Sequence, residues 1–495
     1  MYYPTLEEAR QIAGTGDFRS IPITREILSD FTTPIQAMRI LRTESSHCFL
    51  LESAADSAQW GRYTFLGFDP TLEVTCADGI LRLKRGTQTA EAPASHPGGT
   101  LRRLLAEHKS PRLPGLPPFT GGLVGYFSYD YIKYAEPSLH LNAEDQEGFH
   151  DMDLMLFEKI IAFDNFRQKL VLIVNADVGD LDRSYPAACA ELDRIDALLH
   201  SGNLLPSRPA HLTTPLRPLF DQASYCAMVE RAKQYIREGD IFQVVLSNRL
   251  EAGFEGSLLD TYRILRTENP SPYMFYFTSD DIELAGASPE TLVKLENGIL
   301  HTFPLAGTRP RGRTAEEDLA LEAELLADEK ELAEHNMLVD LGRNDIGRIS
   351  RFGTVEVERY LSVERFSHVM HIGSTVRGVL REDRDAVDAV DAILPAGTLS
   401  GAPKLRACEI INELENNKRG VYGGAIGYLD FTGNMDTCIA IRMAAKKNGI
   451  VTVQAGGGIV FDSDPVAEWN EVYNKSAIMR TVLNTTGEDH VPAHR

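Results

Sequence analysis

The sequence predicts an α+β fold built on antiparallel β-sheets. Short runs rich in valine, isoleucine and phenylalanine, bounded by glycine, aspartate and proline, recur through residues 1–205, which is typical of strands. Residues 216–490 alternate groups of such runs with stretches of helical periodicity. Because the strands come in groups with helices between the groups, an α+β arrangement is favoured over a doubly wound parallel sheet.

The N-terminal region consists mainly of expected strands. These lie at residues 46–52, 63–68, 72–76, 80–84, 121–127 and 159–175. A proline-rich stretch at 204–218 follows them with little apolar periodicity, which indicates a boundary between regions. We therefore expect two regions, 1–205 and 216–490, with nearly all the chemically informative residues in the second.

The C-terminal region mixes helices and strands. Expected helices lie at 224–238, 316–341, 384–394, 402–414 and 465–483. Expected strands lie at 241–249, 273–277, 291–296, 421–430, 437–443 and 450–454. Ser224 and Asp464 are expected N-caps, and Gly239 is an expected helix terminator.

The amino-acid composition and the first residues indicate which class of protein to expect. Of 495 residues, 43% are hydrophobic and 24% charged, as in an ordinary globular protein. The sequence has no apolar run of about 18 residues, so we expect no membrane span. Its first residues lack the basic-then-apolar layout of a signal peptide. We expect a cytoplasmic protein, or a plastid protein if a transit peptide has been removed.

Cysteine usage and charge exclude further classes. The six cysteines include no Cys-x-x-Cys pair, which argues against disulfides, structural zinc and thiol redox chemistry. The formal net charge of −21 argues against nucleic acid as the main partner. An anionic substrate is compatible with this charge, because salt screens it over about 8 Å.

The segment 304–312, Pro-Leu-Ala-Gly-Thr-Arg-Pro-Arg-Gly, has the chemistry of an anion-binding turn. Gly307 permits close approach of the backbone to a ligand. Thr308 offers a hydroxyl and an N–H, and Arg309 and Arg311 offer planar forks for a carboxylate. Ala306 places a methyl group where a lysine would supply a nucleophile. A basic turn with two solvated arginines is the alternative.

Two pairs of glutamates suggest a metal site. Glu331 and Glu334 lie three residues apart on one expected helix, and Glu468 and Glu471 repeat that spacing on the last. Each pair would share a helix face, and carboxylates on facing helices could hold Mg²⁺ together with substrate and water. The alternative is four solvated carboxylates, since Glu471 is also placed to pair with Lys475.

A glycine run and two cationic side chains complete the candidates. Gly456, Gly457 and Gly458 follow an expected strand, where N–H groups approach a ligand or the chain bends. Arg442 ends an apolar strand and needs an anionic partner, from the protein or from a substrate. His371 suits proton transfer or a structural role. The loop 397–404 opens a helix whose N-terminus could hold an anion or simply be capped.

The order of these motifs resembles that of the chorismate-utilising enzymes, and most closely their anthranilate-forming branch. The resemblance is strong over about residues 220–484 and looser before them. It implies large antiparallel sheets packed as a sandwich with helices outside and between. The motifs that carry it are 304–312, 331–335, 338–345, 369–371, 397–404, 422–428, 454–459 and 468–475.

The resemblance also implies a role for each matching residue. Glu290 would be the general acid that protonates the leaving 4-hydroxyl, with His371 and Thr398 in or beside the proton-transfer site. Glu334 and Glu471 would bind Mg²⁺, with Glu331 and Glu468 nearby. The remaining residues would hold chorismate: Gly307, Thr308, Tyr422, Arg442, Gly456, Gly457, Gly458 and Lys475.

Two missing lysines separate this chain from related branches. Aminodeoxychorismate synthases often carry a nucleophilic lysine where this chain has Ala306. Isochorismate and salicylate synthases carry a lysine that activates water where this chain has Gln243. The resemblance therefore implies ammonia as nucleophile, with anthranilate and pyruvate as products. An aminodeoxychorismate synthase without its lysine is one alternative, and a tryptophan-sensing protein with an inactive site is a remote one.

The resemblance further implies regulation and a partner. Segments 50–53, 61–67 and 269–274 resemble tryptophan-binding elements, in which Ser53, Pro272, Tyr273 and Met274 would contact the amino acid. We therefore expect feedback inhibition by tryptophan. The sequence shows no glutaminase nucleophile elbow, so ammonia would come from a separate glutamine amidotransferase subunit, in a heterotetramer of two large and two small subunits.

Overall fold

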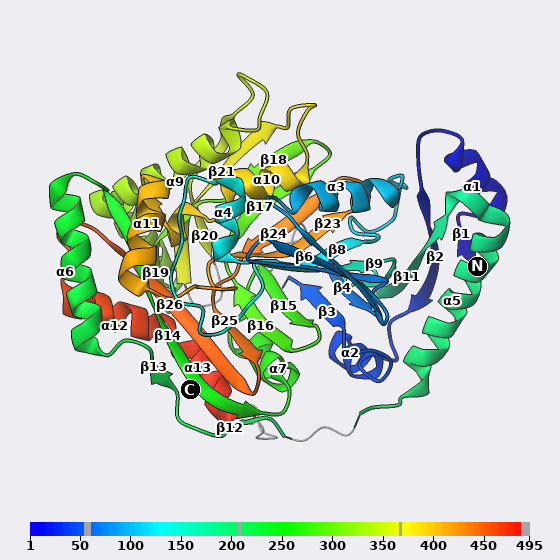
Figure 1. Cartoon of the computed structure of the whole chain (residues 1–495), viewed down its shortest axis with the longest axis horizontal. Helices are drawn as coiled ribbons and strands as arrows, with labels where there is room; N and C mark the ends of the chain where they lie inside the picture. The colour runs from blue at the N-terminus through cyan, green and yellow to red at the C-terminus, as the bar shows by residue number, and fades with distance from the viewer. Residues whose placement is uncertain (54–60, 206–208, 366–368, 487–495) are drawn as a thin grey trace.

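The computed structural model describes residues 1–53, 61–205, 209–365 and 369–486, and two antiparallel sheets lie at its centre (Figure 1). Within those residues the first sheet has 14 strands. From edge to edge they are β1 (Tyr2–Tyr3), β2 (Ser20–Leu28), β11 (Lys169–Asp177), β10 (Lys159–Asp164), β4 (Tyr63–Phe68), β3 (Cys48–Glu52), β15 (Tyr273–Thr278), β16 (Ile282–Ser288), β25 (Met443–Lys447), β26 (Ile450–Ile459), β14 (Gln243–Glu255) and β12 (His211–Leu212), with β13 (Arg217–Pro218) and β22 (Gly401–Ala402) also paired to β14.

The second sheet has 12 strands among the described residues. Their order is β19 (Leu305–Pro310), β21 (Val369–Val379), β18 (Ile299–Thr302), β17 (Thr291–Glu296), β24 (Met435–Ile439), β23 (Ala425–Asp430), β8 (Gly122–Phe127), β9 (Met152–Phe157), β5 (Leu72–Ala77), β6 (Ile80–Arg85) and β7 (Gln88–Pro93), with β20 (Glu356–Arg365) paired to β21. The two sheets and their antiparallel pairing confirm the expected α+β class.

Aromatic side chains pack the two sheets together. Phe49 on β3 and Phe157 on β9 meet edge to face, with ring centroids 4.7 Å apart. Both rings are fully buried, as is Phe275 on β15. They belong to one apolar cluster with residues from both sheets. Since burying each such ring contributes about 1.5–3 kcal/mol, this layer fixes how the sheets sit on each other.

Helices cover the outer faces and the sheet ends. On the first sheet, α5 (Leu181–Ser201) lies along β11 and β2, while α6 (Gln222–Glu238), α11 (Lys404–Glu415) and α12 (Pro465–Lys475) gather at the β14–β26 end (Figure 1). On the second sheet, α9 (Glu329–Gly347) packs on β19 and β21, and α10 (Ala386–Ile393) packs on β17. None of the described helices is long and apolar enough to span a membrane.

The remaining helices are short or peripheral. They are α1 (Leu6–Ala13), α2 (Pro34–Leu41), α3 (Gly98–Glu107), α4 (Ile132–Ala135), α7 (Leu258–Glu268), α8 (Ala315–Ala327) and α13 (Ala477–Thr485), with 3₁₀ turns η1 (Tyr129–Tyr131), η2 (Val178–Asp180) and η3 (Gly397–Leu399).

Several expected elements are divided in the structure. The helix expected at 316–341 is two helices, because Asp328 has extended backbone and caps α9 by accepting from the N–H of Lys330 and Glu331. The helix expected at 465–483 divides at Ser476 into α12 and α13. The strand expected at 159–175 is the β10–β11 hairpin. In the two helices the break depends on local backbone geometry, whereas in the hairpin it falls in the mostly polar segment 164–169.

The expected helix ends are partly right. Gly239 terminates α6 in the left-handed conformation (φ 83°), and Asp464 caps α12 through the N–H groups of Val466 and Ala467. The expected N-cap Ser224 is wrong: α6 begins at Gln222, and Asp221 is the cap that accepts from the Ser224 N–H. Aspartate and serine cap equally well, so composition did not separate the two positions.

The expected boundary falls between α5 and α6, where residues 206–208 lie outside the described residues, as do 487–490 at the end of the second region. Strands from both sides of it share both sheets, since β3 pairs with β15 and β8 with β23. The division into 1–205 and 216–490 therefore remains a prediction about sequence organisation.

Candidate active site

Two neighbouring segments cross from one sheet to the other, and they carry Glu290 and Arg442. The chain passes from β16 to β17 through Glu290, and from β24 to β25 through Arg442. The Ile439 N–H donates to the Glu290 carbonyl at 3.0 Å, and the Ala287 N–H donates to the Arg442 carbonyl at 3.1 Å. Arg442 adopts a left-handed backbone (φ 50°), a costly conformation for a residue of this type. The crossings hold a carboxyl and a guanidinium in one place.

The Glu290 carboxyl is poised to exchange a proton. Its Oε1 accepts a hydrogen bond from Thr398 Oγ1 at 3.0 Å. Desolvation raises the pKa of Glu290 to about 7, against the opposing effects of Thr398, Arg442 and Lys475. Glu290 and Thr398 also line a small cavity of about 40 Å³ closed by α9 and α10. A carboxyl in this state can act as a general acid at neutral pH.

A bulge brings Gly307, Thr308 and His371 together. The β19–β21 register shifts between Ala306 and Thr308, where Gly307 has a φ of 65°. His371 Nδ1 lies 2.9 Å from the Gly307 carbonyl and 3.1 Å from Thr308 Oγ1. Since a carbonyl only accepts, this contact places the proton of the neutral ring on Nδ1 and the lone pair on Nε2. Burial lowers the pKa of His371, so the ring is neutral at neutral pH.

The glycine run lies inside a strand rather than after one. β26 continues to Ile459 and pairs Gly456, Gly457 and Gly458 with β14, which corrects the strand end expected at 454. A methyl group on Gly456 would lie 2.9 Å from the Tyr422 hydroxyl, and one on Gly458 would lie 2.4 Å from Gln243 Nε2. A methyl group on Gly457 would point the other way, 3.2 Å from Glu468 Oε2. The run therefore keeps two faces of the strand open.

Lys475 and Tyr422 flank this run. Lys475 Nζ donates to the Gly456 carbonyl at 3.2 Å and pairs with Glu471 Oε1 at 2.8 Å. The Tyr422 ring is buried, at 6% exposure. The structure thus gathers the predicted substrate-binding residues of α12 and of the Tyr422 loop around Gly456.

The four predicted metal-binding glutamates lie on two helices that influence each other electrostatically. Partial desolvation, and next the charge of Glu331, raise the pKa of Glu334, and the Glu471 charge adds to this shift. Desolvation and the Glu471 charge likewise raise the pKa of Glu468, whose Oε1 accepts from Ser463 at 2.7 Å. This mutual repulsion indicates that the α9 and α12 carboxylates share a space that a cation would stabilise.

These carboxylates do not by themselves form a complete set of metal ligands. The one group of three or more such side chains with ligand atoms within 4.8 Å, among the described residues, is His47, Glu73 and Asp280. Lys84 already pairs with both carboxylates of that group. Glu331 instead lies 3.5 Å from Arg309 Nη1, and Glu471 pairs with Lys475. Any cation between α9 and α12 would take some ligands from substrate and water.

Two buried ion pairs that the sequence did not indicate support the site. Arg419 donates to the carbonyls of Leu399 (2.6 Å) and Val245 (2.7 Å) and pairs with Glu415 at 2.6 Å. Its guanidinium lies 5.8 Å from the Tyr422 ring centroid. The Glu415–Arg419 spacing of four residues was the available signal, but that spacing is common on exposed helices.

The second pair joins Asp345 on α9 to Lys404, the first residue of α11. Lys404 Nζ lies 3.1 Å and 3.0 Å from the two carboxylate oxygens and also donates to the Ile393 carbonyl at 2.9 Å. It therefore ties the helix of Glu334 to the turn that carries Thr398.

The four predicted tryptophan-binding residues line one cavity, separate from the residues above. This cavity has a volume of about 330 Å³ and lies between the sheets at the start of β15. Tyr273 donates to Asp436 at 2.8 Å and accepts from Thr291 at 2.9 Å. The lining includes Ser53, Pro272, Tyr273, Met274, Glu52, Arg62, Phe65, Lys294, Tyr428 and Asp436.

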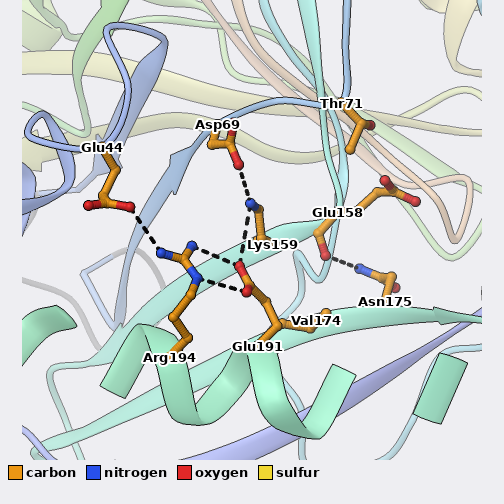
Figure 2. A pocket seen from close by; sticks show the side chains of 9 residues that line it. All are labelled: Glu44, Asp69, Thr71, Glu158, Lys159, Val174, Asn175, Glu191 and Arg194. Atoms are coloured by element: carbon orange, nitrogen blue, oxygen red, sulfur yellow. Dashed lines mark hydrogen bonds and ion pairs between the residues drawn. The ribbon is translucent and has the colours of Figure 1, made fainter. Parts of the chain in front are cut away.

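A larger cavity, of about 520 Å³, contains none of the predicted site residues (Figure 2). Its cations are already paired: Arg194 with Glu44 and Glu191, and Lys159 with Asp69 and Glu191. Figure 2 shows these side chains pointing toward one another across the pocket. Its charges are therefore used to hold α5 against the sheet.

Comparisons with known proteins show the family to which the chain belongs. The family described as chorismate binding enzyme matches residues 46–481. A protein of Acetivibrio thermocellus named anthranilate synthase component 1 is 46% identical over 99% of this chain and 100% of its own length. Its counterpart in Pseudomonas aeruginosa is 45% identical over 96% and 97%.

Solved structures agree. The crystal structure of anthranilate synthase component I from Streptococcus pneumoniae matches with a TM-score of 0.75 and 40% identity, over 92% of this chain and 99% of the other. MenF, the menaquinone-specific isochorismate synthase from Escherichia coli, shares the fold, with a TM-score of 0.70 at 22% identity over 97% and 98% of the two chains.

Proposed function

The chain belongs to the chorismate binding enzyme family, and we propose that it acts as component I of an anthranilate synthase. In this function it converts chorismate and ammonia to anthranilate and pyruvate. The Glu290 carboxyl, with a pKa near 7 and a hydrogen bond from Thr398, is the observation that carries this assignment. The similarity to component 1 proteins over nearly the whole chain favours it over aminodeoxychorismate synthase.

Chorismate is a dianion, and the proposed site offers cations and backbone donors for its two carboxylates. Arg442 and Lys475 are exposed side chains at the sheet crossing and beside Gly456. Thr308 contributes a hydroxyl next to the Gly307 bulge. Gly456 and Gly458 leave room beside Tyr422 and Gln243 for the substrate ring, because any side chain there would fill that space.

Magnesium fits the α9–α12 glutamates. They are hard oxygen donors, and desolvation together with the neighbouring carboxylates raises the pKa of Glu334 and of Glu468, which a bound cation would counteract. We assign Glu334 and Glu471 as ligands, with Glu331 and Glu468 nearby. When bound, the cation would draw electron density from the ring carboxylate and so make the ring more electrophilic.

The proton transfers follow from the side chains. Glu290, protonated, gives its proton to the 4-hydroxyl, which leaves as water while ammonia adds at C2. Thr398 orients the Glu290 carboxyl for this transfer. His371, with its Nε2 lone pair, would accept the C2 proton or stabilise the developing charge as the bond between ring C3 and the ether oxygen breaks. The enolpyruvate that leaves takes up a proton and becomes pyruvate. Ala306 and Gln243 offer no amine to compete with ammonia.

We further propose that tryptophan binds the 330 Å³ cavity lined by Ser53, Pro272, Tyr273 and Met274. Its mix of aromatic, aliphatic and charged walls suits an indole with an amino-acid end. Ammonia would come from glutamine through a separate amidotransferase subunit, in a heterotetramer of two copies of each subunit.

The experiment that tests the reaction uses the purified chain, chorismate, Mg²⁺ and ammonium sulfate at mildly alkaline pH. We expect anthranilate fluorescence that EDTA abolishes and excess Mg²⁺ restores, and that tryptophan reduces. Consumption of chorismate with an amino-chorismate product that retains the pyruvyl group would instead identify an aminodeoxychorismate synthase. Untouched chorismate under these conditions would contradict the assignment.

A further inference from the structure

A fourth cavity lies on the β14–β26 part of the first sheet, at the lower left of Figure 1, and includes none of the residues assigned above. Its volume is about 600 Å³. Alternate residues Arg249, Glu251 and Gly253 of β14 form its floor with Thr452 and Ile450 of β26, which pair with Glu251 and Gly253. Residues 146–149 and 213–217 form the walls. The floor is therefore a sheet face that two loops enclose.

A buried arginine stands at one end of this cavity. The Arg249 side chain is 2% exposed. Its Nη2 donates to Gln146 Oε1 at 3.0 Å, and its Nη1 forms an ion pair with Glu147 Oε2 at 3.2 Å. Its Nε has no acceptor within the described part of the chain. Buried donors are nearly always satisfied, so this N–H indicates an additional acceptor.

The carboxylate that pairs with Arg249 has one oxygen to spare. Glu147 Oε1 is buried and has no donor among the residues that the structure describes. Glu251, half exposed, lies 3.4 Å from Arg249 Nη2 and adds a second carboxylate at the rim. The cavity thus offers a donor at Arg249 and acceptors at two glutamates within one space.

The rest of the lining mixes apolar residues with threonines, Asn448 and the cation Arg217. Phe149, Pro215, Ala252 and Ile450 border the cavity. Lys447 is held elsewhere, since it donates to the Gly148 carbonyl and pairs with Asp281 at 3.3 Å. An apolar surface next to side chains of opposite charge suits a ligand that has a hydrocarbon part and two charged groups.

We propose that this cavity binds a free α-amino acid with an apolar side chain. The carboxylate of the ligand would accept from Arg249, its ammonium group would donate to Glu147 and Glu251, and its side chain would lie on Phe149 and Ile450. A simple anion would meet the repulsion of two glutamates as well as the attraction of Arg249 and Arg217, and a simple cation would meet the reverse. A zwitterion satisfies both ends at once.

The test measures binding of each of the twenty L-amino acids to the full chain by isothermal titration calorimetry, with acetate and methylammonium as singly charged probes. The blocking variant is Ile450→Trp, on an exposed residue that opens β26 after a glycine turn. Its matched control is Ile80→Trp, since Ile80 also opens a strand after a glycine and has nearly the same exposure, 44% against 45%.

We expect an apolar amino acid to bind the wild type and Ile80→Trp equally, and Ile450→Trp at least tenfold more weakly. Tryptophan bound in the Ser53 cavity would be unaffected by either change, which separates the two sites. Glu147→Gln, which keeps the shape and removes one of the two repelling charges, should weaken binding of the amino acid and strengthen binding of acetate. The proposal is overturned if no amino acid distinguishes Ile450→Trp from Ile80→Trp, or if acetate binds as tightly as the amino acid.

Discussion

The candidate active site and the pocket of Figure 2 use charge in opposite ways. The pocket is the larger, at about 520 Å³, yet its Lys159 and Arg194 are matched by neighbouring carboxylates. At the candidate active site, the cavity beside Glu290 is only about 40 Å³, but the pKa values of Glu290, Glu334 and Glu468 are all raised.

The difference teaches that the protonation state of the carboxyls distinguishes these two places better than cavity size does. Paired charges stabilise a fold, whereas a carboxyl with a raised pKa stores free energy that a substrate or metal can recover. In this chain Glu290 is such a group where two segments cross between the sheets, and Glu334 and Glu468 are such groups where α9 faces α12. Burial also raises the pKa of carboxyls elsewhere, at Asp130, Asp153 and Asp430.

The comparison predicts its largest effect when one carboxyl is removed from the candidate active site and one from the pocket of Figure 2. Glu290→Gln should lower kcat by about 10²–10⁴, because a general acid contributes that much. Glu191→Gln, in the pocket of Figure 2, should leave kcat within about twofold and act only through stability, since it removes ion pairs that lie partly in solvent. Anthranilate fluorescence under saturating chorismate measures both. A similar loss in the two variants would remove the distinction.

The buried support of the site can be tested through stability. Arg419→Met leaves Glu415 as an unpaired buried carboxylate, which should cost about 3–5 kcal/mol. The exposed pair of Arg82 and Glu91, about half accessible on both sides, provides the control: Arg82→Met should change stability by about 1 kcal/mol or less. Urea denaturation followed by circular dichroism compares the two. Equal urea midpoints for the two variants would mean that the contacts of Arg419 stabilise the fold no more than the exposed pair does.

The metal proposal predicts a shift in magnesium dependence. Glu334→Gln and Glu471→Gln should each raise the Mg²⁺ concentration for half-maximal activity by about tenfold or more, since loss of a ligand costs about 1.4 kcal/mol or more of binding. Glu324→Gln, an exposed carboxylate on α8 that pairs with Arg309, should leave it unchanged. The Mg²⁺ titration of activity is the measurement, and identical curves for all three variants would contradict the ligand assignment.

The smallest expected effect separates the two faces of the glycine run. Gly456→Ala places a methyl group 2.9 Å from the Tyr422 hydroxyl and 3.0 Å from the Leu246 carbonyl, whereas Gly457→Ala meets only side-chain atoms, at 3.2 Å and 3.3 Å. We expect the first to raise KM for chorismate by about tenfold and the second by about twofold, a difference of about 1 kcal/mol in binding. A larger increase in KM for Gly457→Ala than for Gly456→Ala would place the substrate on the other face of β26.

The sequence predicted much of the fold, and local geometry limited the rest. Strand-rich composition and grouping gave the α+β class, and Gly239 and Asp464 were recognised at helix ends. The break at Asp328 was missed because apolar periodicity runs through it, although the α9 helix that carries Glu331 and Glu334 begins there. The glycine run was placed after a strand because glycine disfavours strands, yet pairing with β14 keeps it inside one.

The site residues could be recognised from ordered motifs, but their contacts could not. Glu290 and Thr398 are 108 residues apart, and only the fold brings them within hydrogen-bond distance. The Glu415–Arg419 pair was not predicted, because a spacing of four residues does not reveal burial. The local sequence thus identified side chains that can take part in chemistry, while the sheet crossings and burial determined their pKa values.

The central claim is that Glu290 supplies the proton, and the pH dependence of kcat/KM tests it most directly. Free ammonia is held constant at each pH by adjusting total ammonium, so that the profile reports the enzyme. The raised pKa of Glu290 means that the acid form predominates below about 7, so kcat/KM should fall as pH rises through that value. His371 adds no falling limb there, because its pKa is lowered. We predict that Glu290→Gln retains a small activity without this limb; the same limb in the variant would contradict the account.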